Sequence, residues 1–139
     1  GSGLVGSEMC IRDRTGTYLY LEPLNRYQDH MLNTQEDAVN IIRQGGFKRV
    51  KLTSDFYHMA IEEDDISETL KKYKDYVGHI HIAENHRYQP GTGSIDWKRH
   101  METLKEIGYE GPVVNEGRIR GEDPLKVYQE SVNFMKQFM

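Results

Sequence analysis

The stretch Val77-Gly78-His79-Ile80-His81 decides the fold, because it is a short strand-like run that ends in a potential metal ligand and precedes a helical pattern. Three other segments repeat this arrangement: Tyr18-Leu19-Tyr20-Leu21-Glu22, Val50-Lys51-Leu52-Thr53-Ser54-Asp55 and Pro112-Val113-Val114-Asn115-Glu116. Strands that alternate with helices indicate βα units and a parallel sheet. The sequence therefore predicts an α/β fold of four βα units.

The residues that close these four runs are Glu22, Asp55, His81 and Glu116. Each one, taken alone, is typical of an ordinary strand-end, turn or core residue. The carboxyl ends of parallel strands, however, meet at one rim, where the loops converge and the chemistry gathers. Three carboxylates and one imidazole at the same rim predict an oxygen-rich metal site.

The two histidines of the third run lie two residues apart, so both side chains should point to the same face of the sheet. Ile80 and Ile82 should then point to the other face, towards the helices. For His79 the favoured interpretation is a packed core histidine, which leaves His81 as the candidate ligand.

Helix signals fill the segments between the strands. Thr34 and Asp37 form a box-like N-terminal cap, and Gly45-Gly46 should end that helix. Later helices are expected from Asp65, from near Asp96, and from Asp123 with Pro124 at the first helical position. The last helix is expected to bury a stripe of Leu125, Tyr128, Val132, Met135 and Phe138.

Chain length conflicts with a closed barrel. Eight βα units need about 250 residues, whereas this chain has 139. We expect residues 15–139 to form a half-barrel that either is completed by another chain or has lost an N-terminal half. Its open edges should favour a homo-oligomer, with four apolar residues at inward or edge positions: Leu19, Leu21, Leu52 and Val113.

Composition excludes several classes of protein. The net charge of -4 without a basic block argues against nucleic-acid binding. No apolar run approaches the roughly 20 residues that cross a bilayer. The single cysteine, Cys10, excludes an internal disulfide framework and fits a reducing cytoplasm. Residues 1–14 lack periodicity; we expect a non-native leader, a cloning remnant followed by a run that resembles translated sequencing-adapter sequence.

From Thr17 to Met139 the chain resembles the C-terminal half of the ketose 3-epimerases, which act on D-tagatose, D-allulose and L-ribulose and share a TIM barrel with xylose isomerase. The segments that carry the resemblance are Glu22–Tyr27, Asp55–Met59 with Ile61–Asp65, Gly78–Arg87 with Pro90–Trp97, and Gly108–Glu116. The resemblance implies a metal-dependent epimerase or isomerase of carbohydrate metabolism that acts on a small-molecule ketose.

The same resemblance implies that Glu22, Asp55, His81 and Glu116 bind one divalent metal, with Mn²⁺ expected first and Mg²⁺ or Co²⁺ as alternatives. Glu22 and Glu116 would also be the catalytic base and acid, which remove and return a proton beside the sugar carbonyl through an enediolate.

It further implies that His58 and Arg87 contact substrate oxygens. Gln28 stands where the family commonly has a second substrate-contacting glutamate, so the preferred sugar is left open.

Three alternatives remain at this point. An aldose–ketose isomerase or an inosose dehydratase would use the same barrel and metal. A DNA-repair endonuclease of a related barrel is opposed by the net charge. A half-barrel could also bind metal and self-associate without turnover.

Overall fold

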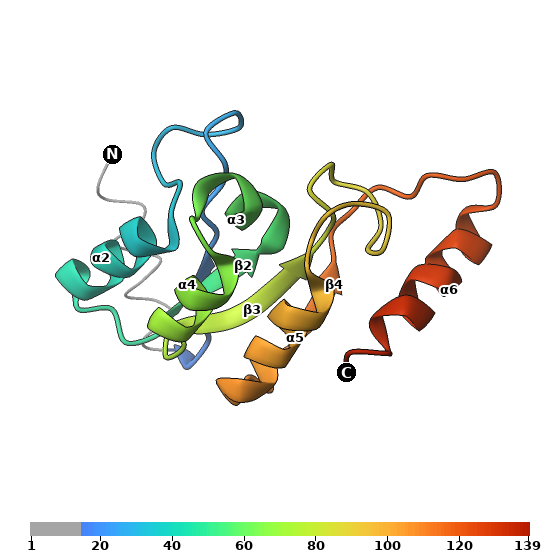
Figure 1. Ribbon diagram of the computed structural model, residues 1–139. Coiled ribbons are helices and arrows are strands. Elements are labelled where there is room, and N and C mark those ends of the chain that lie inside the picture. The colour runs from blue at the N-terminus through green and yellow to red at the C-terminus, as the bar shows by residue number, and fades with distance from the viewer. Residues whose placement is uncertain (1–14) are drawn as a thin grey trace.

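The computed structural model describes residues 15–139 and contains one parallel sheet in the order β1-β2-β3-β4. The expectation for residues 1–14, including Cys10, lies outside the described residues. The strands are β1 (Leu19–Leu21), β2 (Val50–Asp55), β3 (Val77–Ile82) and β4 (Val113–Asn115). The helices are α2 (Gln35–Gly45), α3 (Phe56–Glu62), α4 (Ile66–Lys72), α5 (Trp97–Glu106) and α6 (Pro124–Met135). Figure 1 shows these successive βα units, which confirm the predicted α/β fold with parallel strands.

Side chains cap the helices where the sequence predicts it. The Thr34 hydroxyl accepts a hydrogen bond from the Asp37 amide at 3.1 Å, and the Asp37 carboxylate accepts one from the Thr34 amide at 3.2 Å. Gly46 ends α2 with a φ of 63°, a left-handed conformation that suits glycine. The later helices start at three aspartates whose carboxylates accept first-turn amides: Asp65, Asp96 and Asp123.

The sequence reading missed one helix, α3, which follows β2 directly. Asp55 closes β2 and also caps α3, since its Oδ1 accepts a hydrogen bond from the Tyr57 amide at 2.8 Å. The same residue therefore ends a strand, starts a helix and faces the carboxyl rim. The hydrogen bond from the Tyr57 amide therefore fixes the orientation of the Asp55 side chain without a bound metal.

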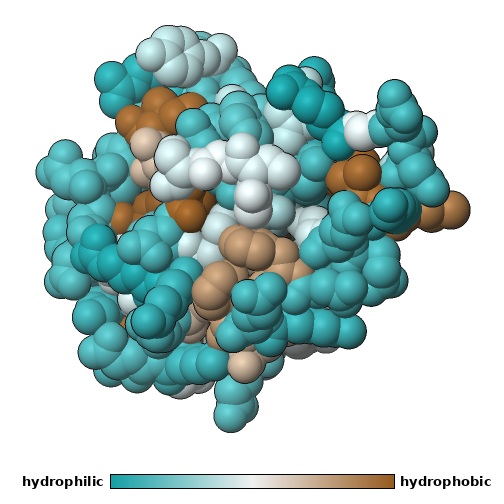
Figure 2. Space-filling model, turned by 45° about the vertical axis from the view of Figure 1, so that its right-hand side comes forward, coloured by the Kyte–Doolittle hydropathy of each residue, from teal (hydrophilic) through white to brown (hydrophobic). Residues whose placement is uncertain are grey.

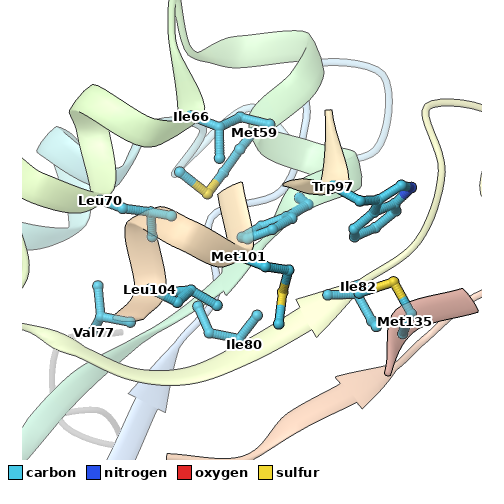
Figure 3. Packing of buried hydrophobic residues seen from close by; sticks show 11 residues of the cluster. Met59, Ile66, Leu70, Val77, Ile80, Ile82, Trp97, Met101, Leu104 and Met135 are labelled. Carbon is cyan, nitrogen blue, oxygen red and sulfur yellow. The ribbon is translucent and has the colours of Figure 1, made fainter. Parts of the chain in front are cut away.

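Two apolar clusters pack between the sheet and the helices. The larger one joins β3 to α3, α4, α5 and α6, and Figure 3 shows its packing. Ile80 and Ile82 belong to it, which confirms that they face the helices. The smaller cluster joins α2 to β1 and β2 around the fully buried Leu52 and Val39.

The predicted inward or edge position of Leu52 is therefore wrong. Successive side chains of a strand point to opposite faces of the sheet, so Leu52 points to the face opposite that of Asp55. There it packs against α2. Leu19, Leu21 and Val113 do lie on the edge strands, but they pack against the helix-side clusters. The other face instead carries Tyr20 and Val114, which are 44% and 42% exposed.

The predicted buried stripe of α6 is also partly wrong. Met135 is buried, but Leu125 is 83% exposed and Tyr128 is 48% exposed. α6 lies beyond β4 at the end of the sheet (Figure 1), so that part of its apolar side meets no sheet. Apolar patches interrupt the mostly hydrophilic surface in Figure 2. Among the described helices, none has both the length and the apolar character needed to cross a membrane.

Candidate metal centre

The four residues that close the strand-like runs lie together at the carboxyl rim of the sheet. Glu22 follows β1, Asp55 ends β2, His81 lies near the end of β3 and Glu116 follows β4. One donor atom from each lies within 4.8 Å of the donor atoms of the other three. The parallel direction of the strands brings together residues as far apart in the sequence as Glu22 and Glu116.

The imidazole of His81 stands at the middle of this cluster. Its Nδ1 lies 2.9 Å from Glu116 Oε2, 3.1 Å from Glu22 Oε1 and 3.7 Å from Asp55 Oδ2. The Asp55 side chain is fully buried, whereas 48% of the Glu116 side chain is exposed. The cluster is thus closed at the β2 side and open towards Glu116.

The donor set fits a hard divalent cation. Burial raises the pKa of Glu22, and the neighbouring carboxylates of Glu116 and Asp55 raise it further, although His81 partly opposes them. Carboxylates crowded in this way repel one another, and a divalent cation would remove that cost. Three oxygen donors with one imidazole suit Mn²⁺ or Mg²⁺ better than they suit structural Zn²⁺, which is commonly bound by cysteine sulfur.

Arg87 lies against the cluster from the loop after β3. Its guanidinium donates to Asp55 Oδ2 at 2.7 Å and to Glu116 Oε2 at 2.5 Å. The guanidinium carbon also stands 4.6 Å from the centre of the Tyr57 ring. Arg87 is the only described non-glycine residue with a positive φ, at 65°. Its position at the rim is therefore specified by both side-chain and backbone contacts.

His58 is buried beneath the rim. From the sequence alone, a histidine three residues after Asp55 would be expected to be partly exposed. Its Nδ1 accepts hydrogen bonds from the Asn25 amide at 3.0 Å and from the Asn25 side chain at 2.9 Å. Burial, helped by the positive charge of Arg87, lowers the pKa of His58 to about 4. The ring is therefore neutral near pH 7 and holds the β1–α2 loop in place.

That low pKa predicts how stability depends on pH. The folded state binds a proton on His58 less readily than the unfolded chain, whose histidines titrate near 6.5. The free energy of unfolding should therefore be greatest above pH 6.5 and fall as the pH drops towards 4, by about 2 kcal/mol between pH 7.5 and 5. Urea unfolding with a chelator present measures it. In a His58→Gln variant this contribution should vanish, and an equal pH slope in both proteins would contradict it.

Gln28 is exposed and lines a cavity of about 240 Å³ beside the cluster. The other lining residues are Tyr57, His86, Arg87, Tyr88 and Arg118. His79 stays outside the four-residue cluster, and the centre of its ring lies 4.8 Å from that of His81. It is only half-buried and belongs to neither apolar cluster, so the expected core position is wrong.

The sequence reading missed Tyr88 and Arg118. Arg118 follows Glu116 by two residues, and its amide donates to the Arg87 carbonyl at 2.7 Å. Tyr88 pairs with Arg118 in an isolated parallel bridge. The nearest sequence signal was Gly117, whose missing side chain lets the two loops approach, since a Cβ there would lie 2.9 Å from the Tyr88 carbonyl oxygen.

The chain is similar in sequence to a known protein family and to several characterised enzymes. The family model described as xylose isomerase-like TIM barrel matches residues 9–138. A 3-dehydro-D-guloside 4-epimerase of Escherichia coli (strain K12) is 52% identical over 126 residues, which cover 91% of this chain and 48% of that protein. A D-psicose 3-epimerase of Enterocloster bolteae is 36% identical over 119 residues, which cover 82% of this chain and 39% of that protein.

Solved structures agree with these matches. The crystal structure of 3-keto-D-glucoside 4-epimerase from E. coli, in its apo form, superposes with a TM-score of 0.93 and 48% sequence identity. The match covers 96% of this chain and 51% of that one, so the chain spans about half the length of the relatives it matches. The chain therefore belongs to the xylose isomerase-like TIM barrel family.

Proposed function

We propose that this chain supplies the metal-binding half of an epimerase that inverts a hydroxyl-bearing carbon next to a sugar ketone. The observation that carries the proposal is the cluster of three carboxylates and one histidine with donor atoms within 4.8 Å of one another. The names of the two relatives support the same chemistry, because position 4 of a 3-dehydro sugar and position 3 of a 2-ketose both adjoin the carbonyl.

Glu22 and Glu116 are the proposed catalytic pair. Their carboxylates flank His81 at 3.1 and 2.9 Å, so a sugar carbon above the cluster could lose a proton to one and receive a proton from the other. Asp55 and His81 would hold the metal, Mn²⁺ first and Mg²⁺ or Co²⁺ as alternatives. A bound divalent cation would supply positive charge where an enediolate develops its negative charge.

The rest of the substrate is proposed to lie towards Arg87. Arg87 and Gln28 line the 240 Å³ cavity beside the cluster, where Tyr88 and Arg118 add ring surface and hydrogen-bond donors. His58, neutral and fixed by Asn25, would complete the polar wall. The 52% identity to an epimerase named for a guloside favours a 3-keto glycoside over a free ketose, with D-psicose and L-ribulose as the second candidates.

Deuterium uptake tests the proton step directly. The purified chain with Mn²⁺ in D₂O should exchange the hydrogen beside the ketone, which NMR of a 3-keto glycoside, D-psicose and L-ribulose would detect. Turnover should be slower than that of a relative of twice the length, because fewer strands surround the sugar. Glu22→Gln and Glu116→Gln should each slow exchange by about 100-fold or more.

Glu110→Gln is the matched control, since Glu110 is exposed and outside the cluster. Equal exchange rates in the wild-type chain, both cluster variants and this control would refute the assignment of the proton carriers.

We also propose that the chain self-associates through its open sheet face. Tyr20 and Val114 are exposed there, and β1 and β4 are the edge strands of the sheet. Exposed strand edges and apolar patches favour pairing with another chain. Sedimentation at micromolar concentration should therefore give a dimer or a larger assembly, and Val114→Lys should shift it towards monomer. A compact wild-type monomer would contradict the proposal.

A further inference from the structure

Glu84 is a buried carboxylate outside the proposed metal centre. Its exposed fraction is 0%, and it lies two residues beyond β3. Glutamate is seldom fully buried without a cation, because desolvating a carboxylate costs free energy. The donors that bond to Glu84 are the neutral groups of Gly91, Ile95 and Trp97, so hydrogen bonds from the surrounding loop, and no cation, offset the cost of burying this carboxylate.

The Glu84 carboxylate ties together the loop between β3 and α5. Oε1 accepts hydrogen bonds from the Trp97 indole at 2.6 Å and from the Gly91 amide at 2.8 Å, and Oε2 accepts one from the Ile95 amide at 3.2 Å. The loop also passes so close at Gly93 that a Cβ there would lie 2.5 Å from Oε2. The loop is thus folded around this one carboxylate.

The same loop carries Arg87 in its left-handed conformation. The Arg87 amide donates to the Glu84 carbonyl at 2.8 Å, and the Glu84 amide donates to the Tyr88 carbonyl at 3.0 Å. A left-handed non-glycine residue is strained and persists only when its surroundings hold it. The Glu84 backbone bonds directly to this turn, and the Glu84 side chain bonds to the rest of the loop, so together they hold Arg87 in this conformation.

A second set of contacts joins this loop to the segment that follows Glu116. The Gln89 side chain donates to the Arg120 carbonyl and accepts from the Arg120 amide, both at 3.0 Å. The Arg118 amide donates to the Arg87 carbonyl. Movement of the Glu84 loop would therefore shift both Arg87 and the segment next to Glu116.

We propose that Glu84 is a positioning residue that sets where the Arg87 guanidinium meets Asp55 Oδ2 and Glu116 Oε2. The inference rests on the proposed function, because it treats these oxygens as donors to a divalent cation. Arg87 and the cation then compete for the same two oxygens. Loosening the loop should release Arg87 and so tighten metal binding.

A double-mutant cycle on Mn²⁺ affinity, measured by calorimetry on the purified chain, tests this. Glu84→Gln keeps the shape but replaces one acceptor oxygen by a donor, so at least one of the three hydrogen bonds is lost. We expect Glu84→Gln to tighten Mn²⁺ binding about 3-fold and Arg87→Met to tighten it about 10-fold. The double variant should bind Mn²⁺ as tightly as Arg87→Met alone. Additive effects, or no effect of Glu84→Gln, would overturn the proposal.

Glu63→Gln is the matched control. Glu63 also accepts neutral donors, the Gln35 amide at 2.8 Å and the Thr69 hydroxyl at 3.1 Å, but lies outside the cluster. Its replacement should leave Mn²⁺ affinity unchanged. If Glu84→Gln fails to fold, Trp97→Phe removes the indole donor together with part of a buried ring, and it should change the affinity in the same direction. No change would overturn the proposal.

Hydrogen exchange without metal separates this inference from the proposed function. Glu84→Gln should speed exchange of the Arg87 and Arg118 amides about 10-fold while leaving the α2 amides unchanged. A wild-type chain that binds no Mn²⁺ would refute the metal site, and the positioning claim would then stand or fall on these amides. Unchanged exchange there, or equal acceleration throughout the chain, would overturn it.

Discussion

Replacing Asp55 by Asn is expected to weaken Mn²⁺ binding by more than about 100-fold. Changes to residues that orient metal ligands typically cost about 10–100-fold, Arg87 being an exception because its positive charge competes with the cation, and this change removes a charged donor itself. The fold should survive, because the amide oxygen can still accept the Tyr57 amide that Oδ1 accepts at 2.8 Å. Calorimetric titration with Mn²⁺, together with circular dichroism of both proteins, measures the two effects.

Asp65 offers a closely matched control for this variant. It caps α4 by accepting the Glu68 amide at 3.1 Å, and it pairs with the guanidinium of Arg99 at 2.6 Å, much as Asp55 caps α3 and pairs with Arg87. It lies outside the cluster of donor atoms. Asp65→Asn should therefore leave Mn²⁺ affinity unchanged. Similar losses in both variants would mean that Asp55 acts through folding and is not a ligand.

The proximity of the four cluster residues was predictable because it depends on strand direction alone. Parallel strands send their last residues to the same rim, whatever the loops between them do. The face of each strand was predictable too, since residues two apart share a face. Counting back from Asp55 places Thr53 on its side and Leu52 on the other, so the misplacement of Leu52 was avoidable.

The loop residues could not be predicted in this way. Glu84 owes its place to donors from Gly91, Ile95 and Trp97, and Arg118 owes its place to a bond with Arg87. Such contacts depend on how two irregular segments fold against each other, which no short periodicity records. The exposure of Leu125 was equally hidden, because it depends on what lies beside α6 and not on the helix itself.

The second large effect concerns Phe56, the first residue of α3. Its side chain is fully buried, with its ring centre 6.0 Å from that of Trp97 and 5.5 Å from that of His100. Phe56→Ala should lower the free energy of unfolding by about 3–5 kcal/mol, because it removes buried apolar surface and leaves a cavity. That is a large share of the 5–15 kcal/mol of a typical domain. Urea unfolding of the purified chain measures the loss.

The effect should reach the metal centre because Asp55 caps α3 and His58 lies within this helix. At urea concentrations where the wild type stays folded, the Phe56→Ala chain should lose Mn²⁺ binding together with its helical signal. Leu125→Ala is the control, since Leu125 is 83% exposed and its truncation should change the free energy of unfolding by less than about 0.5 kcal/mol. Equal losses in the two variants would show that the cluster around Phe56 does not hold α3 to the sheet.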